Sequence, residues 1–267
     1  MHYDLYKIKS IEKAINMLKL FNSKSPELTL NELGKALNIH KSSAHRIAVT
    51  LANGGLLKWD PYKGTYSLGL MLLELSGVLS NNLEIRSQAR PNLEKLHQDT
   101  GELVHLVVLD DGEIVYIDKV ESKKGIRLYS EIGKRALCHC TALGKAILSG
   151  LPNESVRAIL KEKGMKRFTQ NTIVEIPELI KQLEEVRKNG YALDMEEHEP
   201  MIYCLAVPIK DYSGKCIAAV SITCIARNSA EVNLVDNYKD IMLKTGKQIS
   251  CELGYIEDRS QVDGNQN

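Results

Sequence analysis

The hydrophobic pattern of this 267-residue chain changes its period near residue 100, and that change constrains the fold more than any other feature. Before Gly101, apolar residues recur mainly three and four positions apart, which is typical of amphipathic helices. After Gly101 they alternate or form short runs between turn residues, which is typical of strands. The length allows one large domain or two smaller ones. The change of period favours two, in an α+β protein.

Three short helices are predicted at the N-terminus. The first should have Ser10 as its N-cap and end near Phe21. The second begins at Thr29, whose hydroxyl can form a capping box with Glu32. After a short turn, the third covers residues 41–53. Its expected inward residues are Ala44, Ile47, Ala48 and Leu51. Two short helices joined by a tight turn form a helix-turn-helix.

A hairpin follows these helices, because residues 56–59 and 65–68 alternate around a turn that contains Pro61 and Gly64. Helix, helix, helix and hairpin is the order of a winged helix-turn-helix. The outward face of the third helix carries small hydroxyls, a His and an Arg, which suit phosphates and base edges in a major groove. The predicted DNA contacts are Thr29, Lys41, Ser42, Ser43, His45, Arg46, Lys63 and Tyr66. The alternative is a small α+β domain with an ordinary solvated surface.

The distribution of charge along the chain helps to decide between a DNA-binding domain and an ordinary solvated domain. The formal net charge of the whole chain is only +1, which by itself argues against a nucleic-acid binder. Residues 1–80, however, hold ten Lys and Arg against six Asp and Glu, whereas residues 81–267 hold 25 against 28. The chain therefore combines a basic N-terminal part with an acidic C-terminal part, and the basic part favours DNA binding.

A strongly apolar helix should follow the wing. Residues 69–79 are apolar on every side, so this helix needs a partner on more than one face. It either lies buried within its own chain or joins two subunits, as a palindromic DNA site would require. The next helix, residues 83–100, contains Pro91, which should kink or restart it.

The rest of the chain predicts a mixed domain. Strands are expected at residues 103–109, 114–120, 126–130, 191–194, 202–209 and 216–225, and helices at residues 142–148, 154–163, 178–189 and 231–251. No glycine-rich phosphate loop and no Gly-x-Ser-x-Gly motif occurs. Such a domain has room for a pocket between its sheet and its helices.

Two clusters in this domain could carry chemistry. Cys138, His139 and Cys140 suggest zinc, but consecutive residues of a strand point to opposite faces, which disfavours a single site. A nucleophilic cysteine paired with a distant His is a further alternative. The second cluster follows Asp194, where residues 196–199 are expected to form a solvated acidic loop. Asp194 itself closes a strand and is the better pocket residue.

Several segments in register identify the chain as similar to the IclR-type transcriptional regulators, from about residue 10 to residue 254. They are Leu33-Gly34-Lys35-Ala36-Leu37, Lys41-Ser42-Ser43-Ala44-His45-Arg46, Tyr66-Ser67-Leu68-Gly69, His139-x-Thr141-Ala142-x-Gly144-Lys145, Gly190-Tyr191-Ala192-x-Asp194-x-Glu196-Glu197, Cys204-Leu205-Ala206-x-Pro208-Ile209 and Ala218-Ala219-x-Ser221. The chain departs from the family at Ser67, where Arg is common, and at Leu137-Cys138 and residues 201–203.

The resemblance implies a C-terminal ligand-sensing domain related to GAF-like domains. It also implies a pocket lined by Ala136, Ala142, Leu143, Asp194, Cys204, Ser221 and Thr223. In such a pocket the start of a helix would attract an anionic group of the ligand, two hydroxyl groups could form hydrogen bonds with it, and one side would be apolar. Tyr203 is expected to narrow or re-line this pocket.

We therefore predict a transcriptional regulator that binds a palindromic DNA operator, forms a homodimer or homotetramer, and acts as a repressor controlled by a small organic acid. A winged helix-turn-helix (8–68), a connecting helix (69–81), an effector domain (82–256) and a disordered tail (257–267) are the expected parts. No cofactor and no metal is expected. The absence of a signal peptide, of a membrane span and of a cysteine framework predicts a cytoplasmic protein with reduced thiols. The alternative is a small enzyme or metal protein that uses His139, Asp194 and Cys204.

Overall fold

The computed structural model describes residues 7–22, 24–82, 84–122, 131–226 and 233–256. The chain divides into two compact units, an N-terminal unit, Met1–Leu83, and a C-terminal unit, Glu84–Asn267. The predicted strand at residues 126–130 and the predicted tail at residues 257–267 lie outside the described residues. No described helix has both the length and the apolar character needed to cross a membrane.

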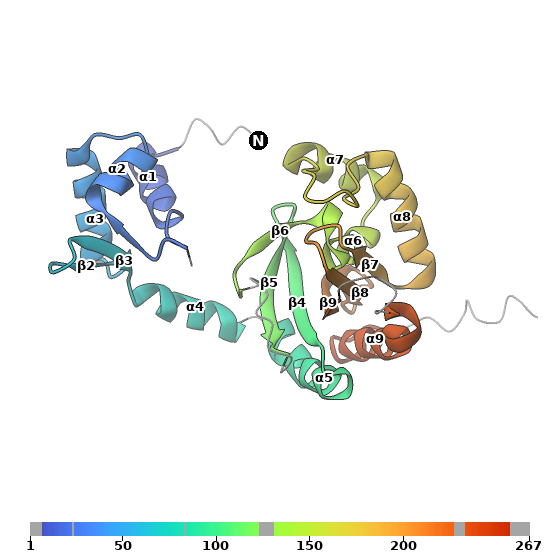
Figure 1. The fold of residues 1–267 in the computed structure, drawn as a ribbon. Coiled ribbons are helices and arrows are strands. Elements are labelled where there is room, and N and C mark those ends of the chain that lie inside the picture. The colour runs from blue at the N-terminus through green and yellow to red at the C-terminus, as the bar shows by residue number, and fades with distance from the viewer. Residues whose placement is uncertain (1–6, 23, 83, 123–130, 227–232, 257–267) are drawn as a thin grey trace, which may run out of the picture. The chain divides into compact units, whose positions relative to one another are not determined.

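The N-terminal unit contains the three predicted helices and the hairpin (Figure 1). Its elements are α1 (Lys9–Leu18), β1 (Glu27–Thr29), α2 (Leu30–Ala36), α3 (Lys41–Asn53), β2 (Leu57–Asp60), β3 (Thr65–Leu68) and α4 (Met71–Asn82). The prediction that Ser10 caps α1 is wrong, because the N-cap is Ile8 and no side chain caps this helix. The predicted capping box of Thr29 and Glu32 is present at the start of α2.

A short strand that the hydrophobic pattern does not reveal completes the wing. β1 pairs antiparallel with β3, so the small sheet has the order β1-β3-β2. Three residues are too few to display a period of two, and only the pairing of Leu28 with Tyr66 makes this segment a strand. The sheet and the three helices share one core, which includes Met17, Leu33 and Leu57.

The C-terminal unit is built on a six-stranded antiparallel sheet of order β6-β5-β4-β9-β8-β7. Its strands are β4 (Leu103–Asp110), β5 (Glu113–Val120), β6 (Arg135–Leu137), β7 (Ala192–Met195), β8 (Ile202–Lys210) and β9 (Cys216–Ile225). β8 and β9 form the predicted second hairpin, and β9 lies in the middle of the sheet.

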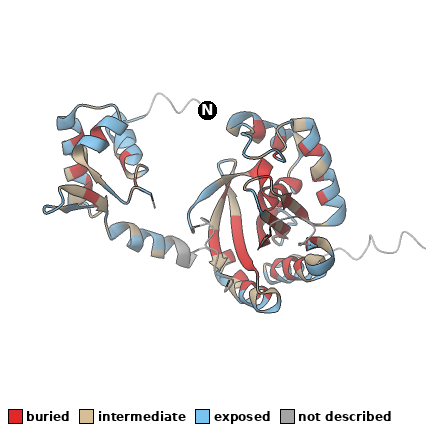
Figure 2. Cartoon of the chain, viewed as in Figure 1, coloured by how far each residue is buried: buried red, intermediate tan, exposed pale blue. Residues whose placement is uncertain are grey.

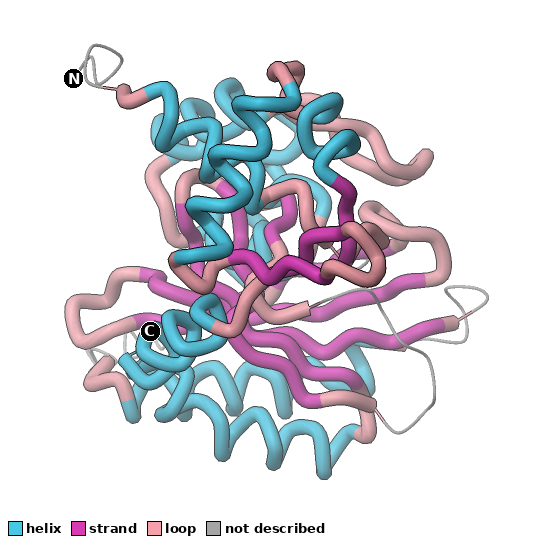
Figure 3. Tube along the Cα trace, turned by 90° about the vertical axis from the view of Figure 1, so that its left-hand side faces the viewer, coloured by secondary structure: helices cyan, strands magenta, loops and turns pink. Residues whose placement is uncertain are grey.

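Helices cover the sheet in two layers (Figure 3). Helix α5 (Glu84–Thr100) packs on β4 and β5, α9 (Leu234–Glu252) packs on β8 and β9, and these two helices contact each other. On the other side, α6 (Ala142–Ser149) packs on β8 and β9 and contacts α8 (Ile176–Asn189), which in turn contacts α7 (Asn153–Lys163). Helix α5 runs through Pro91 without interruption, so the predicted restart does not occur.

Helix α6 is the most deeply buried helix of this unit (Figure 2). All eight of its residues are buried, including Lys145. It lies so close to the turn before it that a Cβ atom added at Gly144 would stand 2.4 Å from the Cα atom of Cys138. Only glycine permits this approach, and it brings the first turn of α6 against the 3-10 turn that follows β6.

Candidate functional site

The outward face of α3 has the composition that the sequence predicts. Ala44, Ala48 and Leu51 are buried in the core of the N-terminal unit, and Ile47 is half-buried. Five of the eight predicted DNA-binding residues are exposed on this helix: Lys41, Ser42, Ser43, His45 and Arg46. The His40 ring caps the helix, and its Nδ1 atom lies 2.9 Å from the Ser42 hydroxyl oxygen. The start of α3 is therefore ordered by local hydrogen bonds while its surface remains open to a ligand.

The tip of the wing is shaped by Asp60. Its Oδ1 atom accepts hydrogen bonds from the backbone N–H groups of Lys63 and Tyr62, at 3.2 and 2.9 Å, and these bonds lower the pKa of the carboxyl group. The Lys63 ammonium lies 2.7 Å from the Glu27 carboxylate of β1. The Tyr62 side chain is 99% exposed at the tip, and sequence reasoning did not select it.

Two predicted DNA-binding residues, Thr29 and Tyr66, also have structural roles. The Thr29 hydroxyl donates to the Glu32 carboxylate at 2.8 Å and accepts from the Glu32 N–H group, so it serves the capping box. Tyr66 is only 4% exposed, and its ring lies 4.6 Å from the Trp59 ring between centroids. The ring therefore belongs to the core of the N-terminal unit, and a DNA contact of Tyr66 stays a prediction.

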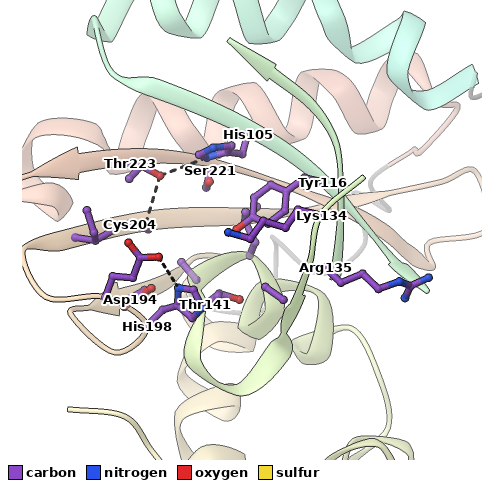
Figure 4. Close-up of a pocket in the computed structure, with 15 residues that line it drawn as sticks. His105, Tyr116, Lys134, Arg135, Thr141, Asp194, His198, Cys204, Ser221 and Thr223 are labelled. Carbon is purple, nitrogen blue, oxygen red and sulfur yellow. Dashed lines mark hydrogen bonds and ion pairs between the residues drawn. The ribbon is translucent and has the colours of Figure 1, made fainter. Parts of the chain in front are cut away.

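A pocket of about 180 Å³ opens between the sheet and the first turn of α6 in the C-terminal unit (Figure 4). The structure brings together in it all of the predicted effector-binding residues, which are Ala136, Ala142, Leu143, Asp194, Cys204, Ser221 and Thr223. Further lining residues that sequence reasoning did not select are His105, Tyr116, Lys134, Arg135, Thr141, His198, Glu199 and Ile202.

Strand register explains why these residues meet. Asp194 of β7 pairs with Cys204 of β8, and Cys204 pairs with Thr223 of β9. The three side chains therefore form a row across neighbouring strands on the same face of the sheet. Tyr203 is the neighbour of Cys204 along β8 and lies on the opposite face, where it is buried. It does not line the pocket, so the expectation that it narrows the pocket is wrong.

The part of the inner wall that Cys204, Thr223 and His105 form is polar but uncharged. The Cys204 Sγ atom lies 3.3 Å from the Thr223 hydroxyl oxygen, which lies 3.4 Å from Nδ1 of His105. Burial lowers the pKa of His105 to about 3 and raises the pKa of the Cys204 thiol well above its usual value. At neutral pH the wall therefore presents a neutral imidazole, a thiol and hydroxyl groups.

Asp194 and Ser221 complete this wall. Asp194 is 2% exposed, and burial raises the pKa of its carboxyl group to about 7, although the Glu197 N–H group donates to it at 2.7 Å. The Ser221 hydroxyl is fully buried and has no hydrogen-bond partner among the described residues. An unpartnered buried hydroxyl is costly, and a ligand atom in the pocket could satisfy it.

The expectation of a solvated acidic loop after Asp194 is wrong for Glu197. This residue is 4% exposed, and its carboxylate lies 2.5 Å from the ammonium of the fully buried Lys145. Lys145 and Glu197 both occur in the segments shared with the IclR-type regulators. Their presence in these shared segments was the only feature of the sequence that could have marked them as functional, because neither charge pattern nor periodicity predicts a buried ion pair.

The alternative site made of His139, Asp194 and Cys204 does not assemble. Residues 138–140 form a 3-10 turn rather than the expected strand. The His139 ring donates through Nε2 to the Lys166 carbonyl oxygen at 3.0 Å and does not line the pocket that holds Asp194 and Cys204. Among the described residues, no group of three His, Cys, Asp or Glu side chains could hold a metal ion.

Comparison with known proteins places the whole chain in one family. Residues 10–61 match the IclR helix-turn-helix domain, and residues 78–251 match the bacterial transcriptional regulator IclR C-terminal domain. The chain is 34% identical over 248 residues to the HTH-type transcriptional regulator XynR of Escherichia coli, covering 93% of this chain and 98% of XynR. It is 28% identical to the HTH-type transcriptional repressor AllR of Salmonella typhimurium, covering 92% and 90%.

The fold agrees with solved structures of the same family. The crystal structure of IclR from Thermotoga maritima superposes with a TM-score of 0.74 at 33% identity, covering 93% of this chain and 100% of that chain. The winged helix-turn-helix and the mixed α/β domain with its pocket are thus the two halves of one regulator. The chain belongs to the IclR family of DNA-binding transcriptional regulators.

Proposed function

We propose that this regulator is a homodimeric repressor that binds a palindromic operator. Its affinity for the operator is controlled by a small organic acid bound in the pocket of its C-terminal unit. The observation that carries the proposal is the fully buried Ser221 hydroxyl, which has no partner among the described residues and lines a cavity together with Asp194. The relative AllR is a transcriptional repressor, which supports a repressor here as well. The names of the relatives likewise support a regulator rather than an enzyme.

The chemistry of the pocket favours a carboxylate ligand. Thr141 caps α6 by accepting from the Gly144 N–H group at 3.1 Å, which leaves the amides of Ala142 and Leu143 without an intrahelical acceptor at the pocket. Such amides attract an anion. Ser221 and a protonated Asp194 can each donate a further hydrogen bond. Figure 4 shows Ser221 on the sheet side of the cavity and Thr141, at the start of α6, on the other side.

The size of the pocket limits the ligand. Its volume of about 180 Å³ is close to that of an engineered cavity of roughly 150 Å³ that binds benzene. An acid with a small carbon skeleton therefore fits, whereas a nucleotide or a coenzyme does not. His105 and Tyr116, whose rings meet edge to face at 5.2 Å, would bound the ligand on the β4 and β5 side.

Helix α4 supports the homodimer. It carries one charged residue, Glu74, and several exposed apolar side chains: Met71, Leu73, Leu75 and Val78, with Leu70 just before the helix. Leu73 is 70% exposed and Val78 is 62% exposed. A helix that exposes several apolar side chains in the part of the chain that the structure describes is a typical subunit contact. We propose that α4 packs against a second copy, so that two copies of α3 read two half-sites of one operator.

Ser221→Ala tests the effector site directly. We expect the affinity for the effector to fall about tenfold, because one hydrogen bond to the ligand is lost. The melting temperature should not fall, since the hydroxyl has no described partner to lose. The effector is first identified by thermal-shift screening of small carboxylic and sugar acids, and affinities are then measured by calorimetry. Equal affinities of wild type and variant would remove Ser221 from the site.

The pH dependence of binding tests the role of Asp194. Because its pKa is raised to about 7, the carboxyl group is largely protonated below that pH and can donate to the ligand. Above about pH 7, affinity for a carboxylate should fall up to tenfold per pH unit, as the proton must be taken up on binding. Asp194→Asn should abolish this dependence, and Asp211→Asn, at an exposed turn, should preserve it. A pH-independent wild type would contradict the assignment.

Arg46 is the residue most informative for operator recognition. Its guanidinium makes no ion pair with any residue that the structure describes, and it lies on the exposed face of α3. Arg46→Ala should weaken binding to an operator selected from random DNA by about 1–3 kcal/mol and relax the base preference at one position. Arg157→Ala, an exposed arginine of α7, is the matched control. Fluorescence anisotropy measures both, and unchanged affinity and preference would refute the assignment.

Leu73→Glu tests the subunit contact. In a symmetric dimer each substitution occurs twice, so losing two buried leucines costs about 3–6 kcal/mol and raises the dissociation constant of the dimer at least 100-fold. Sedimentation equilibrium should show a dimer for wild type and a monomer for the variant, with a parallel loss of operator binding. Tyr212→Glu, which changes a side chain that is 81% exposed in the C-terminal unit, should leave the dimer intact. A dimeric Leu73→Glu protein would place the contact elsewhere.

A further inference from the structure

Lys145 has no function in the pocket as described so far. Its side chain is fully buried in α6, yet it is not a lining residue. Its Nζ atom lies 2.5 Å from Oε1 of Glu197, a residue of the loop between β7 and β8. Both partners are removed from solvent, since their side chains are 0% and 6% exposed.

Stability alone does not explain this ion pair. Removing two charges from water is costly, and buried ion pairs can often be replaced by apolar side chains of similar volume without loss of stability. A buried pair does, however, have a strict geometry, because each partner left alone would be an uncompensated charge. It is therefore suited to holding one particular loop conformation.

The loop that Glu197 anchors needs such support. Glu196 and Met201 both have left-handed backbone conformations, with φ of 60° and 64°, which non-glycine residues adopt only at a cost. The opposite side of the loop is held by two hydroxyl groups. Thr169 donates to the Glu196 carbonyl oxygen and Thr172 to the Glu197 carbonyl oxygen, each at 2.6 Å.

The same loop controls the wall of the pocket. The Glu197 N–H group donates to Oδ1 of Asp194 at 2.7 Å, and this hydrogen bond is itself buried. His198 and Glu199, the next two residues, line the pocket with Asp194 (Figure 4). A displacement of Glu197 would therefore release the Asp194 carboxyl group and move two further lining residues.

We propose that Lys145 is a positioning residue of the pocket: its ion pair with Glu197 holds the β7–β8 loop in the conformation that orients the Asp194 carboxyl group toward the ligand. The inference deepens the proposed function and rests on it where effector binding is concerned. The positioning of Asp194 can be tested without any effector.

Several titratable groups act on Asp194 from the surrounding elements. Glu197 of the loop and Lys145 of α6 act through their charges, and the backbone N–H group of His198 acts through a hydrogen bond. The charge of Asp194 in turn raises the pKa of three groups that face it, Cys140 of the turn before α6, Cys204 of β8 and Tyr116 of β5. The negative charge of Glu197 raises the pKa of Asp194, whereas the positive charge of Lys145 and the N–H group of Glu197 lower it. Loss of both charges removes one influence that raises the pKa of Asp194 and one that lowers it, whereas loss of the hydrogen bond from the Glu197 N–H group removes an influence that only lowers it.

The experiment measures the protonation midpoint of Asp194 in the full chain by carbon-13 NMR of protein labelled at the aspartate carboxyl carbon, with Asp194→Asn to assign the resonance. In Lys145→Met/Glu197→Met we expect a folded protein whose midpoint is about one pH unit higher, because the N–H group no longer stabilises the ionised carboxylate. In Glu197→Gln we expect a lower midpoint, because a negative neighbour is lost while the amide oxygen can still accept from Lys145.

The control is Lys163→Met, which breaks the exposed ion pair with Asp111 and should leave the midpoint unchanged. A folded Lys145→Met/Glu197→Met protein with the wild-type midpoint would overturn the proposal. Should that variant not fold, Glu197→Gln decides, and an unchanged or raised midpoint there overturns it. A merely structural role would not move the two midpoints in opposite directions.

The effector adds a second and separable readout. With an acid identified by the screen described above, Lys145→Met/Glu197→Met should bind at least tenfold more weakly than wild type, and Lys163→Met should bind equally well. If no acid binds the wild-type protein, the proposed function fails while the titration of Asp194 still tests Lys145. If an acid binds and the titration is unchanged, the proposed function stands and the positioning role fails.

Discussion

The close packing of α6 against the sheet is the constraint on which the C-terminal unit depends. Gly144 allows the helix to touch the turn at Cys138, and no side chain of α6 then remains in solvent. Two consequences follow. The first turn of the helix becomes one wall of the pocket, and Lys145 becomes a buried charge that requires Glu197. The polar end of the pocket is thus assembled by the same packing that forms the core.

The two units differ in whether their ionisable side chains are exposed or buried. In the N-terminal unit the basic residues of α3 and the wing stay on the surface, where a polyanion can reach them. In the C-terminal unit, burial makes His105, Cys204 and in part Asp194 neutral, so the inner wall of the pocket offers mainly uncharged hydrogen-bonding groups, whereas Lys134 and Arg135 are the cations of its lining. The near-neutral net charge of the whole chain does not reveal this difference between the two units.

Much of this could be predicted from the sequence, and the failures have physical reasons. The capping box at Thr29, the buried face of α3 and the β8–β9 hairpin follow from local patterns, which the structure retains. The pocket residues were carried over through shared segments and were found together. Glu197 was misjudged because the burial of its charged side chain depends on a partner distant in sequence, Lys145 on α6. The burial of Tyr66 likewise depends on contacts that the hydrophobic pattern does not show, among them Trp59 on the neighbouring strand of the hairpin.

The sequence by itself determined the order of the elements, the separation of a basic reading domain from an acidic sensing domain, and the family, because periodicity, capping and motif spacing are local properties of the chain. Only the tertiary structure decided that His105 and Tyr116 face the pocket and that Tyr203 does not, since strand register sets which face a side chain occupies. It also decided that Lys145 meets Glu197 across 52 residues, because burying a charge requires a partner that only the folded chain can supply.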